Sequence, residues 1–246
     1  MSMRNQKTQG PRDQGTKGLR DPKTHRWVPW CFGLLVFWSL GLLVPSVARA
    51  AIYDFNFTMP NGGAAIPDGD PSGYQNTVNL GSLAGAIQSI TLTINVSGGY
   101  NGDLYAYISH GSGTSVLLNR VGTGPGDSFG YGDTGFNVTF SSAGAHDIHN
   151  YQDFSPSFNG SGQLTGTWRP DNSGGNGNLG VFNGLDPNGN WTIFFADLSS
   201  GEQSTLLSWS LEIDTVPEPI TCALGLFLTL FIGVRVIRSG KKNSAL

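Results

Sequence analysis

Aspartates within glycine-rich stretches are the residues of this chain with the clearest potential for chemistry. Calcium takes about six to eight oxygen ligands from carboxylates and backbone carbonyls, and loops rich in Asp and Gly supply both. We expect such a Ca²⁺ site to draw on Asp68, Asp70, Asp103, Asp127 and Asp133. Asp186 and Asp197 also flank strand-like segments, where loops would converge. No stretch has EF-hand spacing, and turn formation alone would also explain several of these aspartates.

Histidine offers a second, weaker kind of site. His146 and His149 have an i, i+3 spacing that could hold zinc together with Asp153, if the fold fixed their geometry. A solvated loop is the simpler interpretation of this cluster. Serines accompany the histidines, but we expect neither a Gly-x-Ser-x-Gly nucleophile elbow nor a subtilisin-type motif. The sequence therefore predicts no catalytic residues and a protein that is not an enzyme.

Aromatic rings suggest a third kind of site, because exposed rings can stack on saccharides. Tyr105 and Tyr107 alternate with Leu104, Ala106 and Ile108, so they should lie on a wet strand face and are the best candidates for a glycan contact. Sheets favour Tyr at such positions in any case. Other candidate rings are Tyr100, Tyr131, Tyr151 and Trp168. Trp191 and Trp209 fall within strand-like segments and should be core.

The composition of residues 51–216 excludes several function classes. They contain twelve Asp and two Glu against two Arg and no Lys, a formal net charge of −12. Such a domain repels phosphate backbones, so we expect no nucleic-acid partner. Both cysteines, Cys31 and Cys222, lie in apolar segments near the chain ends. The central region therefore has no disulfide and no thiolate chemistry.

Short alternating segments separated by Gly, Asn and Asp dominate the central region. They predict strands in 53–57, 90–96, 104–108, 115–119, 136–140, 191–196 and 207–213. Residues 141–178, rich in Ser, Gly and Asn, should form a long surface excursion. No helical stripe and no internal repeat is evident. The fold class is therefore all-β, an antiparallel jelly-roll-like β-sandwich over residues 51–215.

These segments resemble a known family. In order they are Ile66-Pro67-Asp68, Asn101-Gly102-Asp103-Leu104, Gly113-Thr114, Trp168-Arg169-Pro170, Phe182-Asn183-Gly184, Asn188-Gly189-Asn190-Trp191-Thr192-Ile193 and Leu207-Ser208-Trp209-Ser210-Leu211. Their order and spacing are similar to those of the P domain (Homo B domain) that follows the catalytic domain of subtilisin-like proprotein convertases. The resemblance covers about residues 66–213. It implies a jelly-roll sandwich that stabilises or binds, and no proteolysis by this chain, because the family's catalytic domain does not precede these segments.

The N-terminal residues are typical of an export signal. Residues 1–26 contain seven Lys or Arg against two Asp, and residues 27–44 are apolar. Ala48 and Ala50 then supply small residues at positions −3 and −1 of a cleavage site. We expect a signal peptide over residues 1–50 and a mature chain that starts at Ala51. The long basic region also leaves open a later translation start or an uncleaved signal anchor.

The C-terminal residues form a second topogenic element. Val216-Pro217-Glu218-Pro219 leads into an apolar run over residues 220–234, and Arg235, Arg238, Lys241 and Lys242 follow. We expect a transmembrane helix over residues 220–237, near the lower length limit for spanning a bilayer, with the basic end in the cytoplasm. An ordinary anchor helix after a Pro linker would also fit. The element resembles the PEP-CTERM sorting signal of Gram-negative bacteria (residues 216–246), which implies recognition by an exosortase.

Together these patterns predict an exported envelope or matrix protein with a non-catalytic interaction module. Its partners would be the Sec machinery and an exosortase during export, and then exopolysaccharide or a surface protein. It would stay transiently at the inner membrane before reaching the envelope, surface or extracellular matrix. The alternative is an accessory P domain that acts beside a separate subtilisin-like serine endopeptidase.

Overall fold

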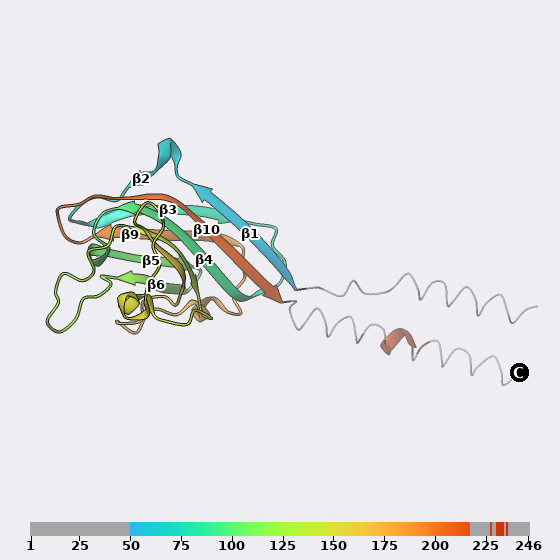
Figure 1. Cartoon of the computed structure of the whole chain (residues 1–246). Coiled ribbons are helices and arrows are strands. Elements are labelled where there is room, and N and C mark those ends of the chain that lie inside the picture. The colour runs from blue at the N-terminus through green and yellow to red at the C-terminus, as the bar shows by residue number, and fades with distance from the viewer. Residues whose placement is uncertain (1–49, 217–226, 228–229, 234, 236–246) are drawn as a thin grey trace, which may run out of the picture. The chain divides into compact units, whose positions relative to one another are not determined.

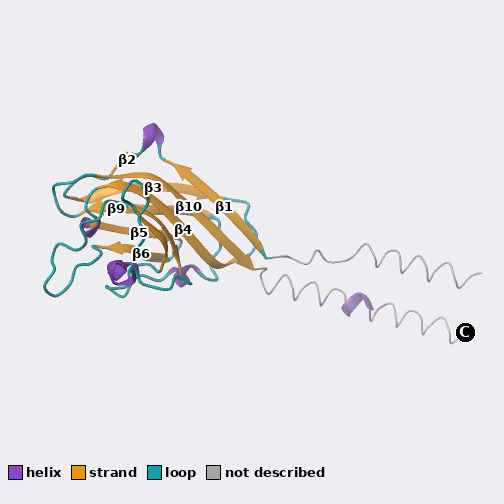
Figure 2. Ribbon diagram, viewed as in Figure 1, coloured by secondary structure: helices purple, strands orange, loops and turns teal. Residues whose placement is uncertain are grey.

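The protein is described by a computed structural model that covers residues 50–216, 227, 230–233 and 235. Its elements are β1 (Ala51–Thr58), η1 (Pro60–Gly62), β2 (Ala64–Ala65), β3 (Asp70–Leu80), β4 (Ala86–Gly98), η2 (Asn101–Asp103), β5 (Leu104–His110), β6 (Gly113–Asn119), β7 (Phe136–Ser141), η3 (Ile148–Phe154), β8 (Leu164–Trp168), η4 (Leu179–Phe182), β9 (Gly189–Asp197) and β10 (Ser204–Val216). Strands are thus the main regular structure of residues 50–216, and the helices there are only short 3₁₀ turns (Figure 2).

Two sheets form a sandwich-like arrangement, which confirms the predicted all-β class. Sheet A has the strand order β1-β10-β4-β7-β8, and β2 also pairs with β10. Figure 1 shows β1, β10 and β4 side by side. Sheet B has the order β3-β9-β5-β6. One pair departs from the antiparallel expectation, because β7 and β8 run parallel. The connection over residues 142–163 crosses back before β8 begins, and this return makes a parallel pairing possible.

The core lies between the sheets and follows from period-2 alternation along the strands. Ile90, Leu92, Ile94 and Val96 of β4 are buried, whereas the Thr and Asn residues between them face outwards. The largest fully buried side chains include Trp191 and Trp209, as the sequence predicts.

Trp209 shows how the two sheets are tied together. Its indole Nε1 donates to Asn76 Oδ1 of β3 over 2.9 Å, so a side chain of sheet A is hydrogen-bonded to one of sheet B. A buried indole N–H needs such a partner. The contact therefore fixes the ring as well as filling the core.

The stretch over residues 141–178 is not the surface excursion that its composition suggests. It contains η3 and β8, and it sends Ile148, Tyr151, Leu164 and Trp168 into the core. Tyr151 is fully buried, and its hydroxyl donates to Asp133 Oδ2 over 2.7 Å. Tyr151 and Trp168 are therefore structural, and the expectation that their rings could be outward glycan contacts is wrong.

The predicted topogenic elements fall mostly on residues outside the described ranges. Ala48, Pro217, Glu218, Pro219 and most of the 220–237 segment belong there. Ala50 is exposed and β1 begins at the next residue, while Val216 ends β10. Within the described ranges, no helix has the length and apolar character needed to cross a membrane.

Candidate functional site

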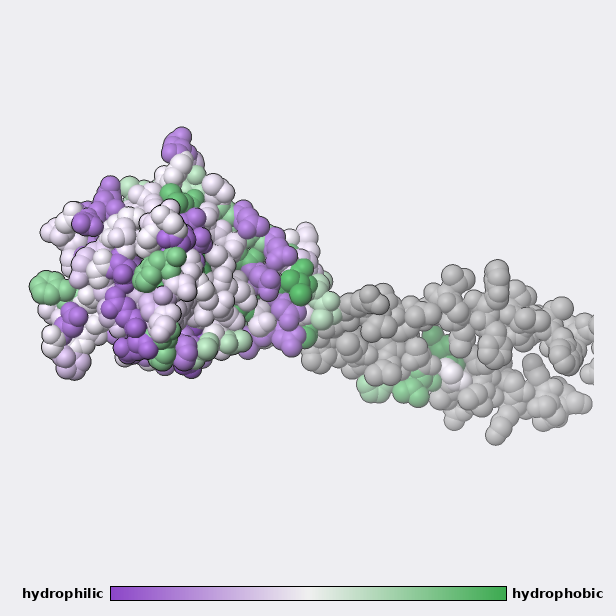
Figure 3. Space-filling model, viewed as in Figure 1, coloured by the Kyte–Doolittle hydropathy of each residue, from purple (hydrophilic) through white to green (hydrophobic). Residues whose placement is uncertain are grey.

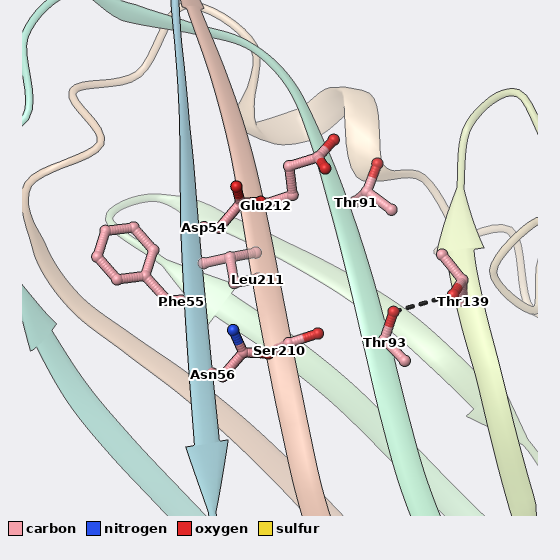
Figure 4. A pocket seen from close by; sticks show the side chains of 9 residues that line it. All are labelled: Asp54, Phe55, Asn56, Thr91, Thr93, Thr139, Ser210, Leu211 and Glu212. Atoms are coloured by element: carbon pink, nitrogen blue, oxygen red, sulfur yellow. Dashed lines mark hydrogen bonds between the residues drawn. The ribbon is translucent and has the colours of Figure 1, made fainter.

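A shallow groove with many polar lining residues lies on the outer face of sheet A. Two adjoining depressions, with volumes of about 270 and 200 Å³, share Asn56, Thr93 and Ser210. The close-up of the larger depression shows side chains from neighbouring strands side by side (Figure 4). We define the polar groove by its polar lining residues: Asp54, Asn56, Thr58, Thr91, Thr93, Asn95, Asn137, Thr139, Ser208, Ser210 and Glu212.

Strand register arranges these residues in rows across the sheet. Asn56 is opposite Ser210, Ser210 is opposite Thr93, and Thr93 is opposite Thr139. The neighbouring row runs Thr58, Ser208, Asn95, Asn137 in the same way. Successive rows lie about 6.8 Å apart along a strand, and neighbouring residues within a row lie about 4.8 Å apart. The face therefore presents a regular array of polar side chains.

The same strands supply the core and the groove, and this is why the array is well positioned. On β4, β7 and β10 each groove residue alternates with a buried one, such as Leu92 and Ile94 on β4 or Val138 and Phe140 on β7, and on β1 with half-buried aromatic residues. A slip of one residue in the register would exchange the two faces, so burial of the apolar set fixes the polar set.

Hydrogen-bonding capacity in the groove is largely free. Thr93 and Thr139 share a hydroxyl–hydroxyl bond of 2.9 Å, and Asn95 Oδ1 accepts from Gln163 Nε2 over 2.7 Å. In residues 50–216 the side chains of Asn56, Ser208 and Ser210 are without a hydrogen bond to another protein group. Hydroxyls and amides both donate and accept. The groove can therefore pair with a ligand rich in hydroxyl groups.

The charge of the groove is negative and confined to one end. Asp54 and Glu212 are register partners on β1 and β10, and both are exposed. Like charges directly opposite each other destabilise a sheet, so this carboxylate pair does not contribute to the stability of the β1–β10 pairing. The two arginines of residues 50–216, Arg120 and Arg169, follow β6 and β8 and are not among the groove residues. A polyanion would be repelled from this face.

Tyr105 and Tyr107 lie on the outer face of the opposite sheet, as the alternation predicts, and both are partly buried. Tyr107 stacks on Phe194 of β9, with ring centroids 4.9 Å apart. Tyr105 meets Tyr107 edge-on at 6.3 Å, and burial, followed by the neighbouring Tyr107, raises the pKa of Tyr105. These three rings form a second, aromatic surface that is separate from the polar groove.

The five aspartates proposed from the sequence as calcium ligands do not form a ready cage. Asp70 accepts from Ser72 N over 2.8 Å, and Asp127 Oδ1 accepts from the backbone N–H groups of Phe129 and Gly130. Asp133 is held by Tyr151 and Gln152, each over 2.7 Å. In the part of the chain that is described, no group of three or more His, Cys, Asp or Glu side chains has an arrangement that could hold a metal ion.

Asp68 and Asp103 instead adjoin a residue that sequence analysis noted only as a strand end, Asp197. Asp197 is fully buried, and its Oδ2 has no hydrogen-bond partner. Burial raises the pKa of Asp197 to about 6, with smaller contributions from the charges of Asp103 and Asp68. Only the topology could reveal it, because β9 brings Asp197 between Asp70 of β3 and Leu104 of β5.

The histidines do not form the zinc site that their spacing permits. His149 is buried, and its two ring nitrogens are engaged with Asp171 Oδ2 at 2.8 Å and with Thr123 O at 2.9 Å. The His146 ring is exposed and stacks on Phe154 at 3.7 Å. The solvated-loop interpretation is right for His146 and wrong for His149, which is a structural residue.

One serine motif was missed in the sequence. Gly126-Asp127-Ser128-Phe129-Gly130 does have the Gly-x-Ser-x-Gly letter pattern, contrary to our expectation. It lies in an exposed loop between β6 and β7, and Asp127 closes a tight turn there. A nucleophile elbow requires a strand followed directly by a helix. No helix follows Gly130 before β7 begins, so the local context of an elbow is missing.

Comparisons with known proteins show no family. No family model and no curated protein matches the chain. The solved structures that are similar to it include the serine protease of Aeromonas sobria alone and this protease in complex with a chaperone. Their sequence identities are 12% and 15%, and their TM-scores are 0.41 and 0.40. Each match covers 72% of this chain but 29% of the other, so the chain spans less than a third of the matched chains.

Proposed function

We propose that this chain is an exported, non-catalytic β-sandwich module that binds a neutral polysaccharide of the cell envelope or extracellular matrix. The polar groove carries the proposal, because it combines free hydroxyl and amide groups with a repeating spacing. Its acidic end and the absence of Arg and Lys from its lining disfavour acidic polymers. Sugar hydroxyls both donate and accept, and so match this lining.

We also propose a fold type and a cellular destination for the protein. The sandwich is a jelly roll of the P-domain kind, supported by the motif order over residues 66–213. The chain enters the Sec pathway through residues 1–50, and an exosortase sorts it at Val216-Pro217-Glu218-Pro219. The surface suits a domain exported into aqueous surroundings. Hydrophilic and near-neutral residues dominate the face in view, and hydrophobic ones are scattered on it (Figure 3).

Affinity electrophoresis of the exported protein in gels with neutral or acidic polysaccharide tests the binding. A neutral polymer should retard the protein, and the double variant Asn56→Ala/Ser210→Ala should weaken retardation about tenfold, since each lost hydrogen bond is worth about 0.5–1.5 kcal/mol. Asn56 and Ser210 are register partners in the middle of the groove.

The opposite sheet offers matched controls. Thr77 and Thr192 share a hydroxyl bond of 2.8 Å on sheet B, as Thr93 and Thr139 do on sheet A. Thr93→Val should reduce binding and Thr77→Val should not. If Tyr107→Ala alone abolished binding, the aromatic surface and not the groove would be the site. Equal retardation of all variants, or co-purification with a serine endopeptidase in place of polysaccharide binding, would refute the proposal.

A further inference from the structure

Two buried side-chain oxygens lack a hydrogen-bond partner in residues 50–216, and they flank one loop. They are Oδ2 of Asp197, at the end of β9, and Oγ of Ser204, at the start of β10. Both residues have 0% of their surface exposed. A buried carboxylate oxygen without a partner is strongly destabilising unless a cation or a proton compensates it. The buried carboxylate of Asp197 at this end of the sandwich therefore needs a cation or a proton to compensate its charge.

Two further acidic residues contact the same loop from other segments, Asp68 through its carboxylate and Asp103 through its backbone carbonyl. Asp68 accepts from Gly201 N with both carboxylate oxygens, at 3.0 and 3.1 Å. The Asp103 carbonyl accepts from Leu198 N over 2.9 Å, and Leu104 is the cross-strand partner of Asp197. Three acidic residues that are far apart in the sequence are thus gathered around residues 197–201.

One basic residue adjoins this group, and it does not neutralise it. Arg120 Nη2 lies 4.0 Å from Asp103 Oδ1, at the outer limit of an ion pair. The same guanidinium donates to the carbonyls of Gly102 and Ser128, over 3.2 and 2.9 Å. One cation therefore faces three carboxylates, and the local charge stays negative.

We propose that Asp197, Asp103 and Asp68 bind one Ca²⁺ ion at this end of sheet B. The available ligands are carboxylate, hydroxyl and carbonyl oxygens, with no sulfur and no imidazole, which suits a hard cation that accepts irregular geometry. Asp197 supplies the buried ligand. The exposed Asp68 and the 14%-exposed Asp103 turn towards the ion as it binds, which is consistent with the lack of a closed cage without the ion. This site does not depend on polysaccharide binding.

Calcium titration of the full-length chain in mild detergent, after treatment with a chelator, tests the site. Calorimetry should show one ion per chain, and free Ca²⁺ at about 100 times the dissociation constant should raise the Tm by roughly 5–10 °C. Asp197→Asn should abolish this rise. Asp68→Asn, at an exposed position, should weaken Ca²⁺ binding at least tenfold while leaving the Tm in chelator unchanged.

Asp214→Asn is the matched control, because Asp214 is an acidic residue at the other end of β10. This variant should keep the full Ca²⁺-dependent rise in Tm. An unchanged Tm in the wild-type chain on addition of Ca²⁺ would overturn the proposal and leave a protonated Asp197 as the explanation. So would a calcium-dependent rise that survives in both Asp197→Asn and Asp68→Asn.

Discussion

At the scale of single residues, the contacts of the buried His149–Asp171 pair hold the 142–178 segment against β6 and the loop that follows it. His149 Nδ1 lies 2.8 Å from Asp171 Oδ2, and Nε2 lies 2.9 Å from Thr123 O. A carboxylate and a carbonyl only accept, so both bonds form together only when both ring nitrogens carry protons. Asp171 is 1% exposed and also accepts from Asn119 N and Ser173. The pair therefore connects three segments through one charged contact.

This pair makes the free energy of unfolding decrease as the pH rises. Burial alone would lower the pKa of His149, but the hydrogen bond and charge of Asp171, with smaller help from Thr123 and Asp147, raise it above its ordinary value. The stabilisation is fully present below the unfolded pKa of about 6.5 and is lost as pH rises through the higher folded pKa. Urea unfolding should therefore give a lower free energy of unfolding at pH 8.5 than at pH 6.

Variants separate this contribution from the rest of the chain. His149→Gln should flatten the pH dependence between pH 6 and 8.5, whereas His146→Gln, at an exposed ring, should preserve it. Asp171→Ala should cost about 3–5 kcal/mol at pH 6, because it leaves a buried histidine without its partner. A pH profile that is the same in the His149→Gln variant and the wild type would show that the pair is not responsible.

At the scale of elements, Gly135 positions the start of β7 and so the edge of the polar groove. Its φ is +83°, and a Cβ there would collide with the carbonyl oxygen of Val96 on β4. Its N–H donates to the buried Asn101 Oδ1 over 2.7 Å, and its carbonyl accepts from Leu164 N over 3.0 Å. A glycine is therefore required for both conformation and space.

Gly135→Ala should lower the free energy of unfolding by about 3 kcal/mol or more, because left-handed strain and a backbone collision add. Gly162→Ala is the matched control. Gly162 also has a positive φ, of +80°, but a Cβ there would meet nothing within 4 Å. The control should cost about 1–2 kcal/mol from strain alone. Equal losses in chemical denaturation would mean that the close approach of β7 to β4 is not important.

Strands with apolar alternation or a short apolar run could be predicted from the sequence, whereas β3 and β8 could not. β1, β4, β5, β7, β9 and β10 were found because apolar residues alternate along them, and β6 was found from its short apolar run although four consecutive residues of it are buried. β3 was missed because its first half, with Pro71 and Gly73, looks like a loop, and its register shifts between Asp70 and Tyr74. β8 was missed because it has only five residues, and Gly166 adopts a φ of +106°. Alternation also carries no information on strand direction, so the parallel β7–β8 pair could not be foreseen.

The candidate sites were predictable only where they follow one strand. Tyr105 and Tyr107 share a strand, and their outward face was predicted correctly. The polar groove needs the registers of four strands, so no single segment reveals it. Asp197 needs β3, β5 and β9 together. The five proposed calcium ligands overlap the three-carboxylate cluster only at Asp68 and Asp103, because loop composition does not show which loops meet.

At the scale of the whole molecule, the start of β1 and the end of β10 lie side by side, so the chain enters and leaves the sandwich at the same place. Ala51 pairs with Thr215, so the first residue after the predicted signal peptide is opposite the last residues before the predicted sorting motif. β1 begins at Ala51 itself, and removal of residues 1–50 would therefore leave every strand of the sandwich intact. Cleavage at either end should not unfold the domain.

This arrangement makes a prediction about export. Mass spectrometry of the protein released from cells should find an N-terminus at Ala51 and a C-terminus close to the 216–219 motif. Replacing Pro217, Glu218 and Pro219 with alanine should leave the N-terminus unchanged and block the C-terminal cut, since the motif that an exosortase would recognise is lost. In spheroplasts, whose outer membrane has been opened, external protease should reach an epitope inserted at Gly124, an exposed position in the β6–β7 loop, but not one added after Leu246. A protected loop epitope would mean that the acidic sandwich stays in the cytosol, and polysaccharide binding outside the cell would then be excluded.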